Sequence, residues 1–172
     1  MNIFITSYDA IEAAYHLDDL RLNKMILETA QLLSSAFRFL FVEDENLYEI
    51  THLNHPCSLW ARKDIYTYSW LVNYFDALSQ EKYRRDVYVK GKNAVYHKSW
   101  DTLFSLFNKK TIDFCPVSIN GNFFDFNCTE YKDEVDIRIA YQKQLNKKWQ
   151  RDIRKPKWTA SNIPFFFSND SL

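Results

Sequence analysis

The chain has 172 residues, enough for one domain that buries roughly two-thirds of its unfolded surface without a disulfide or metal. Its 22 basic and 22 acidic residues give a net charge of zero, which excludes a histone-like protein that binds DNA by charge alone. Three widely spaced cysteines form no disulfide framework, and no segment reaches the roughly 18 apolar residues of a membrane span. We therefore expect a single cytoplasmic domain over residues 1–172, with no cofactor and no metal site.

The first predicted helix begins near Ala10, because Asp9 followed by Glu12 resembles a capping box. After a break around residues 16–19, the helical pattern continues to about Phe39. A break followed by a long apolar helix predicts that this element lies at the centre of the fold.

Three further helices are predicted, over residues 56–85, 93–108 and about 134–154. Asn54 can cap the first of them, since an amide accepts free backbone N–H groups and the proline that follows fits a first turn. Residues 111–132 carry loop signals with room for one short strand. The expected fold is mainly α, a single compact domain of four to five helices with irregular loops and an aromatic-basic C-terminal tail.

The early helix carries a polar seam on an otherwise apolar surface. Steps of three and four residues align its members on one face: Arg21, Lys24, Glu28, Gln31 and Ser35. Because charges are costly to remove from water, such a seam is either hydrogen-bonded between helices or open to a ligand cleft. In a cleft, a partly desolvated Lys24 would be an amine nucleophile, Glu28 would stabilise a sugar cation or transfer protons, and Arg21 would hold a phosphate.

Other residues are candidates for contacts with phosphates or bases. His55 and His97 each have two explanations, a helix cap or a phosphate contact at a helix start. Trp149 and Trp158 stand among basic residues, which fits either stacking on bases or a solvated helix whose tryptophans enter the core. The full candidate set for nucleic-acid or phosphate binding is Asp19, Gln31, Asn54, His55, Trp60, Arg85, His97, Lys98, Lys148, Trp149, Lys157 and Trp158.

Six segments in chain order carry a family resemblance: LDDLRLNKMILETAQLL, THLNHPCSLWARKDIYTYSWL, EKYRR, YHKSW, AYQKQLNKKW and RKPKWT. They are similar to small proteins of bacteriophages and some bacteria that are labelled pyrimidine-dimer DNA glycosylase of the endonuclease V type. The resemblance implies attack on the sugar C1′ by the N-terminal α-amine, supported by a helix-borne glutamate whose counterpart is Glu28. Asn2 is expected to hinder removal of Met1, so at this point the chain departs from the family and Lys24 is the expected amine.

Three functions follow from these patterns. The first is a base-excision glycosylase/lyase or base-modifying enzyme on phage DNA, with Arg21, Lys24 and Glu28 catalytic. The second is a non-catalytic protein that sequesters a nucleotide-like host-defence signal, in a pocket expected at the interface of a homo-oligomer. The third is an inhibitor whose aromatic surface binds a host protein. DNA or a nucleotide is the expected partner in the first two.

Overall fold

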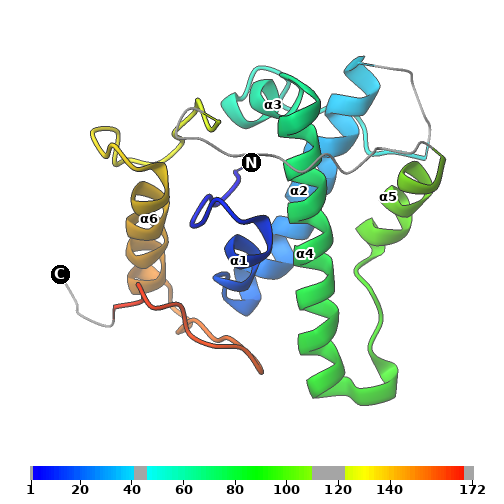
Figure 1. Ribbon diagram of the computed structural model, residues 1–172. Helices are drawn as coiled ribbons and strands as arrows, with labels where there is room; N and C mark the ends of the chain where they lie inside the picture. The colour runs from blue at the N-terminus through cyan, green and yellow to red at the C-terminus, as the bar shows by residue number, and fades with distance from the viewer. Residues whose placement is uncertain (1, 41–45, 110–122, 169–172) are drawn as a thin grey trace.

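The computed structural model describes residues 2–40, 46–109 and 123–168, with the backbone alone for residues 105–109 (Figure 1). Over these ranges the chain is helical and contains no strand, so the prediction of a mainly α domain is confirmed. In chain order the elements are α1 Ala10–Tyr15, α2 Asp19–Leu40, α3 Pro56–Ala61, α4 Ile65–Lys90, the 3-10 helix η1 Gly91–Asn93, α5 Lys98–Lys109 and α6 Ile137–Arg151.

The start of α1 follows the predicted signal. The carboxylate of Asp9 accepts the backbone N–H of Glu12 at 2.8 Å, which satisfies one of the free donors of the first turn. The break predicted around residues 16–19 separates α1 from α2. Apolar side chains of α2, among them Leu22, Ile26 and Leu33, are fully buried, as expected for a central helix.

The single helix predicted over residues 56–85 is wrong, because the chain forms α3 and α4 there. Asp64 starts α4 with a reciprocal capping box: its carboxylate accepts the N–H of Thr67 at 2.8 Å, and the Thr67 hydroxyl accepts the N–H of Asp64 at 3.3 Å. The cap of α3 is His55, whose Nδ1 accepts the N–H of Cys57 at 3.2 Å. Asn54, the predicted cap, is exposed.

The last two helices are shorter than predicted. Helix α5 begins at Lys98, because η1 ends at Asn93 and residues 94–97 are not helical. Helix α6 begins after Asp136, whose carboxylate accepts the N–H of Arg138 at 2.9 Å. Of the predicted loop over residues 111–132, only the part from residue 123 is described, and that part contains no strand.

Helix α4 is the centre of the fold, with α1, α2 and α3 in contact with it (Figure 1). In the view of Figure 1, the N-terminal segment, residues 2–9, lies between α6 and α4. The rings of Phe4 and Tyr141 meet edge to face at 6.2 Å, and the amide of Gln142 donates to the carbonyl of Thr6 at 3.0 Å. The N-terminal segment therefore links α6 to the helical core.

No helix in the described part of the chain combines the length and the apolar character that crossing a membrane requires.

Candidate active site

The polar seam of α2 does not face one cleft. At its start, Arg21 is only 9% exposed, and its Nη1 lies 2.7 Å from Asp152 and 3.1 Å from Asp18. Near its end, the buried hydroxyl of Ser35 accepts the backbone N–H of Thr51 at 3.1 Å. Arg21 is thus an internal ion-pair partner in this structure, which removes the expectation that it is free to hold a phosphate.

The middle of the seam places Lys24 and Glu28 together, as the four-residue spacing predicts. Lys24 Nζ lies 3.3 Å from Glu28 Oε1, and Glu28 Oε2 accepts the backbone N–H of Asn2 at 3.0 Å. The side chain of Glu28 is 15% exposed and that of Lys24 is 68% exposed. The desolvation expected for Lys24 is therefore wrong, whereas the carboxylate beside it is largely shielded from water.

Asn2 connects Glu28 to residues from two other parts of the fold. Its side-chain oxygen accepts a hydrogen bond from the Tyr141 hydroxyl at 3.3 Å and lies 4.0 Å from the sulfur of Cys57. The same hydroxyl accepts the backbone N–H of Cys128 at 3.2 Å. The carboxylate thus stands at the junction of α2, α3, α6 and the loop that precedes α6.

Two thiols and an imidazole, which the sequence analysis missed as a group, meet at this junction. The sulfurs of Cys57 and Cys128 are 3.9 Å apart, and both lie within 4.8 Å of a ring nitrogen of His55. The hydrogen bond between the thiols lowers the pKa of Cys128, although burial opposes this, and it raises the pKa of Cys57, which burial raises further. Burial lowers the pKa of His55, against the attraction of the Glu28 charge.

Three of the predicted phosphate or base contacts are internal instead. Arg85 is 3% exposed; its Nε donates to Glu81 at 2.8 Å and its Nη1 donates to Asp19 at 2.7 Å. Asp19 also accepts the backbone N–H of Thr159 at 3.1 Å. Trp60 is buried, and its indole N–H donates to the carbonyl of residue 123 at 3.0 Å. These contacts hold helices and tail together; Arg85 and Trp60 are buried, and the carboxylate of Asp19 is bound by Arg85 and Thr159.

The remaining candidates are His97, Gln31, Asn54, Lys98, Lys148 and Lys157, of which Gln31 lies about one turn beyond Glu28 on α2. His97 Nδ1 accepts the N–H of Ser99 at 3.2 Å, which fits the cap explanation, and burial lowers the pKa of this imidazole. Gln31 is half-buried on α2. The exposed candidates are Asn54, Lys98, Lys148 and Lys157.

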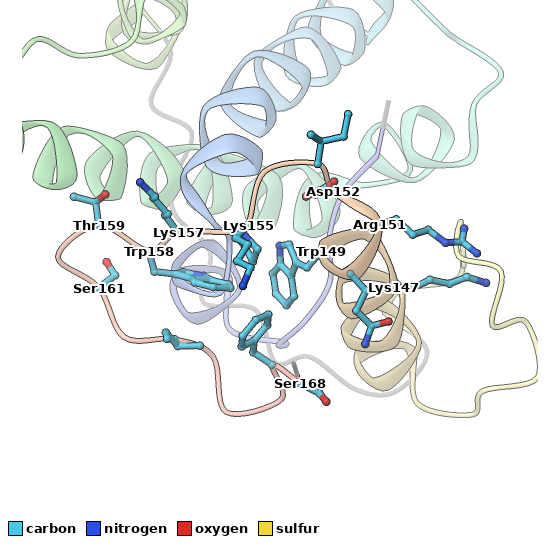
Figure 2. Close-up of a pocket in the computed structure, with 15 residues that line it drawn as sticks. Lys147, Trp149, Arg151, Asp152, Lys155, Lys157, Trp158, Thr159, Ser161 and Ser168 are labelled. Atoms are coloured by element: carbon cyan, nitrogen blue, oxygen red, sulfur yellow. The ribbon is translucent and has the colours of Figure 1, made fainter. Parts of the chain in front are cut away.

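A hollow of about 1300 Å³ lies between the end of α6 and the C-terminal tail, and we call it the basic groove (Figure 2). Its described lining contains one acid, Asp152, against Lys147, Arg151, Lys155 and Lys157. Because Asp152 pairs with Arg21 and Lys147 pairs with Glu130, the positive charge of the groove comes from Arg151, Lys155 and Lys157. This arrangement can hold a chain of phosphates.

The two tryptophans of the groove belong to the core. Trp149 is 3% and Trp158 9% exposed, and their rings meet edge to face at 5.1 Å. Their indole N–H groups point inward, to Asp18 at 2.7 Å and to the carbonyl of His16 at 3.0 Å. Stacking of bases on these rings is therefore the wrong one of the two explanations, and the tryptophans anchor the tail instead.

A protein-family model described as pyrimidine dimer DNA glycosylase matches residues 1–94. The matched range contains Lys24, Glu28, His55 and Cys57, whereas Cys128 and the basic groove lie beyond it. Neither the search of curated proteins nor the search of solved structures gave a match.

Proposed function

We propose that this chain, which belongs to the pyrimidine dimer DNA glycosylase family, is a base-excision glycosylase/lyase whose reaction is centred on Glu28. The observation that carries the proposal is the position of the Glu28 carboxylate. It is shielded from water, it pairs with the amine of Lys24 at 3.3 Å, and it accepts the N–H of Asn2 at 3.0 Å. A carboxylate beside an amine is the set of groups that excision through a Schiff base requires.

In the proposed reaction, Glu28 takes a proton from the Lys24 ammonium, and the neutral amine attacks the sugar C1′. The bond between C1′ and the damaged base breaks, its electron pair leaves with the base, and the base takes up the proton that Glu28 received from Lys24, which returns Glu28 to its carboxylate form. The positive charge that develops on the sugar lies next to the carboxylate, which lowers its energy. The bond between C1′ and the ring oxygen then breaks, the oxygen keeps the electron pair and takes a proton from the attached nitrogen, and an iminium between Lys24 and the opened sugar results.

Strand cleavage would follow from the same iminium. Glu28 removes a proton from C2′, a double bond forms between C2′ and C3′, and the 3′-phosphate leaves with the electron pair of its C–O bond. General acid–base catalysis of this kind contributes roughly 10²–10⁴-fold in rate, so Glu28 is the residue on which both steps depend.

The basic groove supports the choice of DNA as the substrate. Lys155, Lys157 and Arg151 are exposed, and each can neutralise one phosphate. A pyrimidine dimer stacks and pairs poorly, so the energy needed to turn it out of the helix is smaller than for an intact pair. Backbone contacts in the groove would hold the duplex while the lesion reaches Glu28.

Borohydride trapping tests the proposal. A duplex with one cyclobutane pyrimidine dimer, and a second with one abasic site, are incubated with the protein and reductant. We expect a covalent protein–DNA adduct on a denaturing gel, loss of the adduct in Lys24→Ala, and slower formation in Glu28→Gln. Lys92→Ala, which removes an exposed lysine from η1, is the control and should leave the adduct unchanged.

Absence of an adduct from the unaltered protein on both duplexes would refute the glycosylase/lyase proposal. An undiminished adduct in Lys24→Ala, mapped by peptide mass to the N-terminal residue, would refute the lysine version and assign the α-amine mechanism that the family resemblance implies. Tight binding of a free nucleotide without any DNA binding would instead identify a sequestering protein.

A further inference from the structure

We propose that His55, Cys57 and Cys128 form a Zn²⁺ site beside Glu28. Thiolates and imidazoles are the ligands that zinc prefers, and three of them are sufficient when water fills the fourth position of the tetrahedron. The three ligand atoms come from separate parts of the fold, the start of α3 and the loop before α6, and all lie within 4.8 Å of one another.

The spacing of the sulfurs fits a shared metal ion. With Zn–S bonds of about 2.3 Å and tetrahedral angles, two sulfurs on one zinc lie about 3.8 Å apart. The sulfurs of Cys57 and Cys128 are 3.9 Å apart. A disulfide requires about 2.05 Å, so the two sulfurs are not bonded to each other and their spacing fits one shared ion.

The imidazole needs a small adjustment. On a tetrahedral zinc a nitrogen lies about 3.6 Å from each sulfur. His55 Nδ1 now accepts the N–H of Cys57 at 3.2 Å, so its lone pair is directed at the residue that carries one of the sulfurs. His55 is half-buried and can turn, and a zinc bond would replace this hydrogen bond.

The surroundings favour a doubly charged ion bound by two thiolates. Cys57 is fully buried, and a Zn²⁺ ion with two thiolates has no net charge, so the complex avoids the cost of a buried charge. Asn2, which contacts Glu28, lies 4.0 Å from the sulfur of Cys57. Zinc would therefore fix α3 and the loop before α6 around the N-terminal segment.

This inference is independent of the proposed function. Cys128 lies outside residues 1–94, so the family match does not cover the complete ligand set. Failure of zinc binding would leave the borohydride result unchanged, and failure of trapping would leave the metal site unchanged.

The test uses the full chain, reduced and freed of metal with a chelator. After one equivalent of ZnCl₂ is added, native mass spectrometry should show one zinc per chain. Replacement by Co²⁺ should give the absorption of a tetrahedral cobalt ion with thiolate charge-transfer bands. Cys57→Ser and Cys128→Ser should each weaken zinc binding by more than about 100-fold. Losing a residue that only orients a metal ligand already weakens binding by about 10–100-fold, and losing the ligand itself should cost more.

Two controls separate metal binding from changes in folding. His55→Ala and His97→Ala each remove an imidazole whose Nδ1 accepts an N–H two residues further along at 3.2 Å, so the loss of a helix cap is matched. Only His55→Ala should weaken zinc binding. As the second control, circular dichroism of each variant should match that of the unaltered chain.

Absence of bound zinc at one equivalent, or unchanged binding in a Cys128→Ser chain whose circular dichroism is native, would overturn the proposal. Peptide mass mapping that finds Cys57 and Cys128 joined by a disulfide in protein purified without reductant would also overturn it, and would identify the two thiols as a redox pair.

Discussion

Replacing Arg85 by Met tests whether this arginine holds the fold or contacts DNA. The side chain is 3% exposed and makes charged hydrogen bonds of 2.8 Å to Glu81 and 2.7 Å to Asp19. Each bond to a charged group contributes about 1.5–3 kcal/mol, so two give about 3–6 kcal/mol. In the variant, Glu81 still accepts a hydrogen bond from the guanidinium of Arg84 at 2.7 Å, and Asp19 still accepts hydrogen bonds from the hydroxyl and the N–H of Thr159. We therefore expect the free energy of unfolding to fall by about 3 kcal/mol, the low end of this range.

Thermal unfolding followed by circular dichroism at pH 7 measures this loss. For a chain of this size, 3 kcal/mol corresponds to a fall in Tm of roughly 6–12 °C. Arg84→Met is the matched control, since Arg84 pairs with the same Glu81 but has a side chain that is 48% exposed. The guanidinium of Arg84 reaches solvent although Glu81 is buried, and Glu81 keeps its bond to Arg85 in this variant, so the control should lower Tm by less than Arg85→Met does.

DNA binding at several salt concentrations completes the test. If Arg85 is internal, binding by the folded variant keeps the slope of log K against log salt. Equal, small shifts of Tm in Arg85→Met and Arg84→Met would refute the stability argument. A native Tm with a salt slope smaller by about one unit would show that Arg85 binds a phosphate after all.

The other predictions concern the groove and pH. Replacing Lys155 and Lys157 together by Ala should reduce the salt slope by about two units without changing Tm, and an unchanged slope would exclude the groove as the DNA contact. Burial acts to raise the pKa values of Asp19 and Glu81, but their hydrogen bonds lower both below the ordinary 3.8 and 4.5. Their stabilisation is therefore present above those values and lost as pH falls through the lower folded-state values, which urea unfolding between pH 6 and 2 should show. Burial lowers the pKa values of His16, His55 and His97, so stability should already decline as pH falls below 6.5, and His16→Gln should remove part of that decline.

Local signals in the sequence predicted the parts of the fold that depend on neighbouring residues. Asp9 and Glu12 gave the start of α1, and the four-residue spacing gave the Lys24–Glu28 pair. The start of α4 carried a similar signal, Asp64 with Thr67, but the helical spacing of apolar residues continued across it and hid the break.

Contacts between distant residues could not be predicted in this way. Cys57 and Cys128 are 71 positions apart, and only the path of the chain brings their sulfurs together. The sequence of the basic tail does not indicate which of its faces is buried. Trp149 and Trp158 were therefore equally consistent with stacking on bases and with packing in the protein core. The acceptors that decide between these, Asp18 and the carbonyl of His16, belong to the other end of the chain.

The hydrogen bonds between the two ends of the chain also determine when the molecule can assemble. Tyr141 contacts Asn2 across 139 positions, and the indole of Trp158 contacts His16 across 142. Such long sequence separations make folding slow, because the loop between the partners must close before either contact forms. During synthesis, α2 leaves the ribosome with Glu28 in place while the residues that surround its carboxylate are still unmade. The candidate active site is therefore completed only after residue 141 has emerged, and the basic groove, whose lining extends to Ser168, only after that residue has emerged.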